Sequence, residues 1–271
     1  MSHRARKRFG QNFLKDKSVV ERIVDAVGPA DDTPVVEIGP GLAALTLPLL
    51  ERHRQLHVIE LDRDLVARLQ ERDLTGLSIE QADALTVDYS ALARSLGQDT
   101  DKPRLRLVGN LPYNIGTPLL IKLARQHTAI QSLHVMLQRE VIDRLAAVPG
   151  SKHWGRLSVM VNSVFTATRL FDVPPQCFDP EPKVQSAVAR LLPVAHPPDD
   201  EELDALETAT RMAFANRRKT LRNNFRGILD EAELESAGID PGSRAETLEL
   251  DQFKQLASHL PHTRRSGSSE C

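Results

Sequence analysis

Short apolar runs alternate with amphipathic segments through residues 34–147. Such runs are typical of strands that are buried on both faces of a parallel sheet. We expect strands at 35–38, 55–59, 77–81, 105–108 and 133–137. We expect helices at 18–27, 45–51, 62–70, 117–126 and 139–147. This alternation predicts an α/β fold with a doubly wound, mostly parallel sheet.

Local signals refine two of these helices. Ser18 and Glu21 have the spacing of a capping box, so we expect the first helix to begin there and to end at Gly28. Pro48 lies inside the second helical segment and predicts either a kink or a late start, because proline cannot donate a backbone hydrogen bond.

The pattern changes after Gly150. Two further strands are expected at 157–170 and 184–192, separated by residues 173–183, which contain four prolines and predict an extended loop. Residues 193–198 resemble a linker, and apolar residues then recur at helical spacing. We therefore predict one domain over 1–193 with a basic N-terminal arm, a small all-α domain over 199–262, and a disordered tail over 263–271.

Composition excludes several classes of protein. The 271 residues carry a net charge of −2, yet Lys and Arg gather in 4–17 and 211–226, as in proteins with local nucleic-acid contacts. Two cysteines without metal-ligand spacing argue against a disulfide framework or a metal site and favour a reducing cytoplasm. No apolar run approaches the roughly 20 residues that span a bilayer, so we expect no membrane partner.

The most distinctive segment is residues 109–114, with the sequence GNLPYN at the end of a predicted strand. The Asn110 amide and a carbonyl of Leu111 or Pro112 offer acceptors for an exocyclic amino group. Two such acceptors would hold an adenine N6 in its pyramidal, nucleophilic form, and Tyr113 offers a face for stacking. A strand end with an Asx-type turn would have the same sequence, and the segment alone does not decide between them.

A glycine loop follows the first strand of the predicted sheet. Gly39 and Gly41 fit the G-x-G-x-x-G/A pattern, and Glu60 lies about 20 residues further on, so a dinucleotide must be considered. S-adenosylmethionine needs the same close approach and the same ribose acceptor, but no phosphate cradle, and Pro40 removes one N–H from such a cradle. Asp83 could accept from an adenine amino group. Glu37, Glu60 and Asp83 thus place acids at successive strand ends.

These residues resemble a known family, the ribosomal RNA adenine dimethyltransferases, and most closely its bacterial small-subunit members. The matching motifs cover nearly the whole chain in the family's order: 8–14 (RFGQNFL), 36–42 (VEIGPGL), 59–62 (IELD), 81–83 (QAD), 109–114 (GNLPYN), 155–160 (GRLSVM), 178–184 (FDPEPKV) and 214–220 (FANRRKT). The resemblance implies a Rossmann-like class I methyltransferase fold and S-adenosylmethionine as the methyl donor.

The resemblance also implies site residues. It implies that the donor is bound by Gln11, Asn12, Leu14, Gly39, Glu60, Asp83 and Asn110. We expect Gly41, the second glycine of the loop, to bind the donor as well. The catalytic residues are Asn110, Leu111, Pro112 and Tyr113, with Tyr113 and Phe178 on opposite faces of the target adenine. The implied substrate is a pair of adjacent adenosines in the 3′-terminal hairpin of 16S small-subunit RNA, each dimethylated at N6 during late subunit assembly. Separately, we expect the enzyme to be a monomer.

Basic residues supply the expected RNA contacts. Arg211, Arg218 and Arg222 are predicted to share one helix face, with Lys219 beside it. The N-terminal arm adds Arg6, Lys7 and Arg8. A solvated surface would explain either cluster equally well when taken alone.

Three alternative functions remain open at this stage. The first is a noncatalytic RNA-binding assembly factor that retains the fold. The second is a dinucleotide-dependent oxidoreductase. The third is methylation of large-subunit RNA, whose enzymes share the loop at 109–114. A methyl-transfer assay, titration with NADH against S-adenosylmethionine, and mapping of modified adenines separate them.

Overall fold

The computed structural model describes residues 12–97 and 102–261, which divide into two compact units. Among the described residues, the first unit takes in 12–97, 102–146 and 164–197, and the second takes in 147–163 and 198–261. The expected boundary near 193 differs from this division at 147–163. That segment contains α7 (Arg156–Asn162), which packs on helices of the second unit, and Trp154, whose Nε1 donates to Leu248 O at 3.1 Å.

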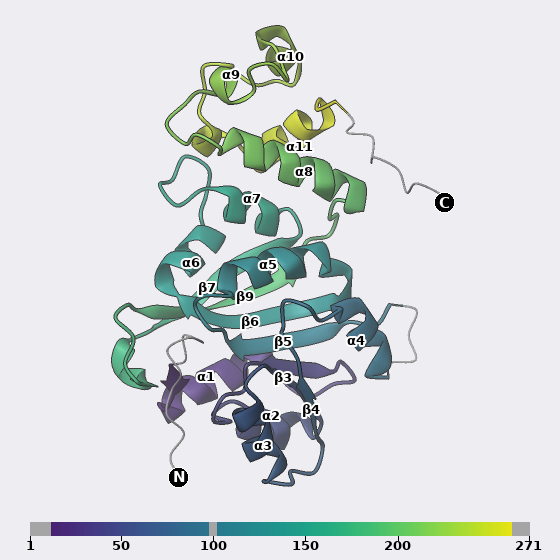
Figure 1. The fold of residues 1–271 in the computed structure, drawn as a ribbon, viewed down its shortest axis with the longest axis vertical. Helices are drawn as coiled ribbons and strands as arrows, with labels where there is room; N and C mark the ends of the chain where they lie inside the picture. The colour runs from purple at the N-terminus through teal and green to yellow at the C-terminus, as the bar shows by residue number, and fades with distance from the viewer. Residues whose placement is uncertain (1–11, 98–101, 262–271) are drawn as a thin grey trace. The chain divides into compact units, whose positions relative to one another are not determined.

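A seven-stranded sheet forms the centre of the first unit (Figure 1). Its strands are β2 (Val35–Ile38), β3 (Leu56–Glu60), β4 (Leu77–Gln81), β5 (Leu105–Asn110), β6 (Ile130–Gln138), β7 (Phe165–Val173) and β9 (Ser186–Pro193). They lie in the order β4-β3-β2-β5-β6-β9-β7, and β9 runs antiparallel to both of its neighbours while the other pairs are parallel. The predicted α/β class is confirmed.

Helices precede or join these strands, since parallel neighbours need crossover connections. They are α1 (Lys17–Val27), α2 (Thr46–His53), α3 (Arg63–Gln70), α4 (Tyr89–Ser95), α5 (Gly116–Arg125) and α6 (Arg139–Leu145), with 3-10 turns η2 (His127–Ala129) and η3 (Pro175–Cys177). Pro48 falls in the first turn of α2, so the late start is the correct alternative. The sequence pattern did not indicate α4, whose capping residue Asp88 accepts from Ser90 N and Ala91 N.

The first helix begins earlier than the capping-box prediction. Asp16 caps α1, and its Oδ1 accepts from Val19 N at 3.1 Å and from the Ser18 hydroxyl at 2.7 Å. The prediction that Ser18 caps the helix is therefore wrong, because the Ser18 hydroxyl is a donor to Asp16. The apolar face remains as expected, with Val19, Ile23 and others buried.

The strand predicted at 157–170 is also wrong in its first half. Residues 156–162 form helix α7, and β7 begins only at Phe165. Consecutive residues of α7, among them Leu157, Val159 and Met160, are buried. A helix that is buried on most sides gives a continuous apolar run, which sequence periodicity cannot distinguish from a buried strand.

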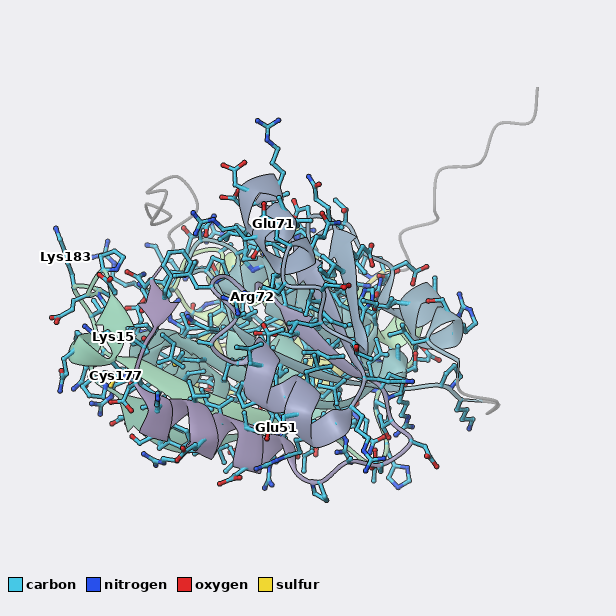
Figure 2. All side chains as sticks on the ribbon, turned by 90° about the horizontal axis from the view of Figure 1, so that it is seen from below. Lys15, Glu51, Glu71, Arg72, Cys177 and Lys183 are labelled. Atoms are coloured by element: carbon cyan, nitrogen blue, oxygen red, sulfur yellow. The ribbon has the colours of Figure 1, made fainter. Side chains whose placement is uncertain are left out.

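A separate two-stranded ribbon joins the N-terminal segment to the proline-rich loop. Here β1 (Phe13–Leu14) pairs antiparallel with β8 (Phe178–Asp179). The backbone N–H of Lys15 extends the ribbon by donating to Cys177 O at 2.8 Å, and Figure 2 shows these two residues together. Segments more than 160 residues apart in the chain are thus held side by side.

The second unit is helical over its described residues. Besides α7 it contains α8 (Asp200–Ala213), α9 (Leu221–Asn224), α10 (Glu231–Ser236), η4 (Ala245–Thr247) and α11 (Leu250–Ser258). Phe214 and Phe253 stack with ring centroids 5.7 Å apart. Of the helices in the described ranges 12–97 and 102–261, none has the length and apolar character needed to cross a bilayer.

The expected arginine face does not form in this unit. Helix α8 ends at Ala213 and α9 begins at Leu221, with turns between them. Arg211 and Arg222 therefore belong to different helices, and Arg218 and Lys219 lie in the connection. The prediction of one continuous helix face is wrong, because the helical spacing of apolar residues continues across the non-helical connection between α8 and α9.

Candidate active site

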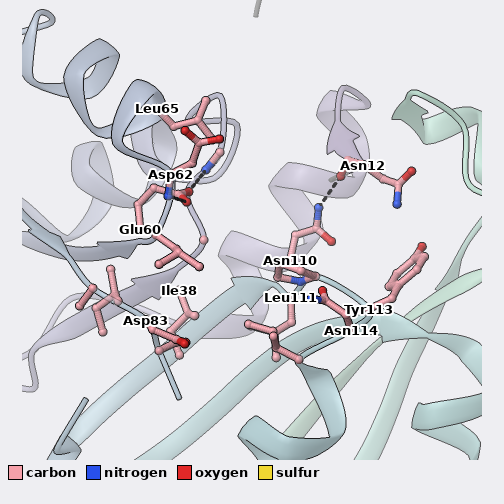
Figure 3. Close-up of a pocket in the computed structure, with 18 of the residues that line it drawn as sticks. Asn12, Ile38, Glu60, Asp62, Leu65, Asp83, Asn110, Leu111, Tyr113 and Asn114 are labelled. Carbon is pink, nitrogen blue, oxygen red and sulfur yellow. Dashed lines mark hydrogen bonds between the residues drawn. The ribbon is translucent and has the colours of Figure 1, made fainter. Parts of the chain in front are cut away.

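A cavity of about 320 Å³ opens at the carboxyl ends of the parallel strands. Strand β2 pairs with β3 on one side and with β5 on the other, and open α/β sheets bind ligands at such a switch point. Glu60, Asp62 and Asp83 lie on one side of the cavity, and Asn110 and Tyr113 lie on the other (Figure 3). Its size is that of a small-molecule site.

The glycine loop offers few free backbone N–H groups for binding a phosphate. Gly39 and Gly41 have φ values of 70° and 57°, which favour glycine. The Gly39 N–H donates to Ile59 O at 2.9 Å, Pro40 has no N–H, and the Gly41 N–H points to Glu60 Oε2 at 3.3 Å. All three positions are thus unable to cradle a pyrophosphate, which argues against the dinucleotide alternative.

Glu60 is a fixed acceptor at the end of β3. Its Oε1 accepts from Asp62 N at 2.9 Å, and its Oε2 faces Gly41 N. Burial raises the pKa of Glu60, and the backbone hydrogen bonds from Asp62 and Gly41 oppose that rise. Each carboxylate oxygen has a second lone pair, so the side chain retains capacity for the hydroxyls of a ribose.

The other two acids at strand ends differ from each other. Asp83 lines the cavity after β4, and its Oδ1 accepts from Leu85 N at 2.9 Å. Glu37 is buried beside Thr46, and burial, with a smaller contribution from the charge of Glu60, raises its pKa to about 8. Glu37 does not line the cavity, so only two of the three acids face it.

The tip of β5 fixes the orientation of the Asn110 amide. Asn110 Nδ2 donates to the backbone oxygen of Asn12 at 2.9 Å. Because a carbonyl oxygen can only accept, the nitrogen must face Asn12, and Oδ1 is the atom left for a ligand. The amide is therefore oriented as an acceptor, as the sequence analysis requires.

The residues after Asn110 divide into buried and exposed positions. Leu111 is buried, and its N–H donates to Met136 O at 3.1 Å. Pro112 O already accepts from Ile115 N at 3.1 Å, which makes Leu111 O the stronger candidate for a second acceptor. Tyr113 lines the cavity half-buried, with its hydroxyl 2.8 Å from Ser186 Oγ, and burial raises its pKa.

Comparison with known proteins agrees with this geometry. The family model described as ribosomal RNA adenine dimethylase matches residues 2–261. The chain belongs to this family. It is 50% identical to the ribosomal RNA small subunit methyltransferase A of Methylococcus capsulatus over 96% of this chain and 99% of that protein. The protein of the same name from Cronobacter sakazakii is also 50% identical, over 95% of this chain and 94% of the relative.

Solved structures share the fold. The 23S rRNA methyltransferase ErmE superposes with a TM-score of 0.68 at 26% identity, over 92% of this chain and 99% of ErmE. A dimethyladenosine transferase from Plasmodium falciparum gives a TM-score of 0.73 at 22% identity, over 90% and 95% of the two chains. The chain has the Rossmann-like class I methyltransferase fold and is an S-adenosylmethionine-dependent adenine dimethyltransferase.

The cavity of this adenine dimethylase fits that donor. The loop offers close approach without a phosphate cradle, Glu60 is an oriented acceptor, and Asp83 stands beside the small side chains Ala82 and Ala84. Apolar groups, including Ile38 and Leu61, make up most of the remaining lining. A charged nucleoside without phosphates matches this set of groups.

Several expected residues lie elsewhere in the dimethylase. Phe178 is fully buried and does not line the cavity, so its ring has no exposed face opposite Tyr113 in this structure. Leu14 is likewise a core residue, 6% exposed. Gln11, Arg6, Lys7 and Arg8 lie outside the described residues.

Phe13 and Ser186 are site residues that the sequence reasoning missed. Phe13 lines the cavity, and its ring lies close enough to Gly41 that a Cβ there would stand 3.1 Å from Phe13 Cδ1. Its place between Asn12 and Leu14 in the first motif was the available signal. Ser186 follows the last quoted residue of the proline-rich motif by two positions and carried no signal of its own.

Proposed function

We propose that this dimethyltransferase acts on two adjacent adenosines in the 3′-terminal hairpin of 16S small-subunit RNA. Each receives two methyl groups at N6, the enzyme acts as a monomer, and the substrate is a late assembly particle in the cytoplasm. The names of the relatives at about 50% identity support the small subunit as the target. The observation that carries the proposal is a single cavity with an oriented Asn110 oxygen across from Glu60 and Asp83.

The donor side would be held by the strand ends β2 to β4. Glu60 would accept from the ribose hydroxyls and Asp83 from the adenine amino group, while Gly39 and Gly41 allow close approach. Asn12, which lines the cavity, is a proposed further contact, with Gln11 beyond the described residues. When bound, S-adenosylmethionine supplies an electrophilic methyl group, and the chain's own groups supply orientation.

The base side would be held by the tip of β5. In the first transfer Asn110 Oδ1 and Leu111 O accept the two N6 hydrogens, which withdraws the nitrogen lone pair from the ring and aims it across the cavity; in the second transfer one N6 hydrogen remains to be accepted. Eversion of the base costs roughly a few kcal/mol, and stacking on Tyr113 returns about 1–3 kcal/mol. The N6 proton is released to water, so no strong general base is assigned.

Basic residues of the second unit would contact the RNA backbone. Arg211, Arg218, Lys219 and Arg222 surround the break between α8 and α9 and are exposed or partly exposed. The arm residues Arg6, Lys7 and Arg8 are proposed to add contacts of the same type.

Mapping of modified adenines tests the proposal. Small subunits and 16S RNA from a strain that lacks the dimethyltransferase are incubated with the enzyme and labelled donor, and mass spectrometry of RNA fragments locates the dimethyladenosines. Two adjacent sites in the 3′ hairpin support the proposal. Methylation of 23S RNA alone, as the likeness to ErmE allows, would overturn the substrate assignment.

A second comparison addresses the assembly-factor alternative. Asn110→Ala should bind particles but not methylate them, so any rescue of assembly by this variant measures a scaffold role. If the wild type methylated mature subunits as fast as assembly particles, the late-assembly part of the proposal would be contradicted.

A further inference from the structure

Ser186 contacts the one residue that is expected to stack on the target base. Its Oγ lies 2.8 Å from the Tyr113 hydroxyl, across 73 positions of the chain. Ser186 is fully buried, whereas Tyr113 lines the cavity and is only partly buried. The contact therefore links the interior of the sheet with a side chain at the edge of the proposed base site.

The two partners differ in how firmly their backbones are held. Ser186 begins β9 and pairs with Gln138 of β6 on one side and with Val173 of β7 on the other. Tyr113 lies beyond the end of β5, in the connection that leads to α5. A ladder on both sides fixes the position of the Ser186 hydroxyl, and the hydroxyl in turn restrains a ring on a less supported segment.

The Ser186 hydroxyl is a polar group in an otherwise apolar stretch of β9. The residues that follow in β9, Ala187, Val188 and Ala189, are apolar and buried, and packing alone would be satisfied by alanine at 186. Burying a hydroxyl without a hydrogen bond costs stability, and the Tyr113 hydroxyl provides the bond. The serine is thus matched to the tyrosine rather than to the core.

We propose that Ser186 is a positioning residue, which holds the Tyr113 ring in the plane against which the target adenine stacks. The inference rests on the proposed function, because it takes the stacking role of Tyr113 from there. Ser186 does not touch the substrate and acts only through Tyr113. Loss of its hydroxyl lets the ring rotate away and lowers the population of correctly stacked base, while the Glu60 side of the cavity is unchanged.

The contact itself is tested by nuclear magnetic resonance without any substrate. The chain has two tyrosines, so 13Cζ-tyrosine labelling gives two resonances, and Tyr113→Phe identifies the one from Tyr113. Ser186→Ala should shift the Tyr113 resonance and leave that of Tyr89 in place. Ser132→Ala, which removes another buried strand hydroxyl from β6, is the matched control and should shift neither.

The positioning role is tested by a double-mutant cycle on the full enzyme. Ser186→Ala should lower the single-turnover rate about threefold to tenfold, as expected for one neutral hydrogen bond, with donor affinity unchanged. Fluorescence of 2-aminopurine at the target position should report less everted, stacked base. Because both substitutions break one contact, Ser186→Ala should have no further effect in a Tyr113→Phe background.

Three outcomes would overturn the inference while wild-type methylation is intact. They are a Ser186→Ala rate equal to that of the wild type, additive effects in the cycle, and a loss equalled by Ser132→Ala with a matching fall in melting temperature. Failure of the proposed function is recognised separately, because the wild type itself would then not methylate the small-subunit hairpin.

Discussion

The two sides of the cavity are held together in different ways. On the donor side, Glu60 contacts Asp62 and Gly41, which are 2 and 19 positions away in the chain. On the base side, Asn110 contacts Asn12 across 98 positions and Tyr113 contacts Ser186 across 73 positions. The contacts of Glu60 therefore lie within one strand-helix-strand unit, whereas those of Asn110 and Tyr113 form only after distant segments have come together.

The two sides also differ in how firmly their ligand-binding groups are held. The Glu60 carboxyl is oriented by two backbone N–H groups, and such charge-assisted contacts are about twice as strong as neutral ones. Asn110 and Tyr113 are each oriented by a single neutral hydrogen bond, worth about 1 kcal/mol. A firm donor side and a more adjustable base side suit a small diffusing nucleoside and a base that arrives attached to RNA.

The largest effect is expected at Asn110. Asn110→Ala removes an acceptor for N6 and the contact with Asn12, so the single-turnover methylation rate should fall about a hundredfold or more. Donor affinity, measured by calorimetry with S-adenosylhomocysteine, should stay within a few-fold. Equal losses of rate and donor affinity would erase the distinction between the two sides.

Glu60→Gln should produce the converse result. The amide keeps the shape of the side chain but directs an NH₂ toward a backbone N–H, either that of Asp62 or that of Gly41. Donor affinity should fall about tenfold to a hundredfold, in line with a lost charged hydrogen bond. The rate at saturating donor should change less. Asp64→Asn, in the first turn of α3, serves as the charge-matched control.

A smaller effect is expected where the RNA backbone is held. Replacing Arg218 and Arg222 together by Ala should weaken RNA binding about tenfold and flatten the plot of log affinity against log salt, because phosphate contacts release counterions. The ion pair lost at Arg222, 3.2 Å from Glu231, is exposed and contributes little. Lys254→Ala in α11 is the control. A salt slope that stays at the wild-type value would remove these residues from the RNA surface.

The smallest effect on methylation is expected at Glu37, whose substitution should change stability instead. Its pKa is about 4.5 in an unfolded chain and about 8 when folded, so folding takes up a proton between these values. The wild-type free energy of unfolding should therefore fall as pH rises through this window, by at most about 1.4 kcal/mol per pH unit, and level off above it. Glu37→Gln should lack this decline in denaturant titrations at pH 5 to 9. Parallel curves for the two proteins would show that Glu37 is ionised in the folded state.

Sequence periodicity located most of the first unit, because its strands are short apolar runs and its loops carry glycine or proline. Periodicity gave the wrong element at α7, which is almost fully buried. It also predicted one helix where α8 and α9 are separated by turns, because the helical spacing of apolar residues continues through those turns. The capping error at Ser18 had a different origin, since both Asp16 and Ser18 are good capping residues and only the geometry selects one.

The sequence by itself determined strands β2 to β6, the glycine loop, Glu60 at the end of β3, Asp83 after β4 and the acceptor at Asn110, because each depends on residues that are close together in the chain. The tertiary structure decided that Glu37 and Phe178 are buried, that Asn12 orients the Asn110 amide, and that Ser186 contacts Tyr113. These facts depend on contacts between distant segments, and the identity of a residue does not state which remote atom will satisfy its hydrogen bond.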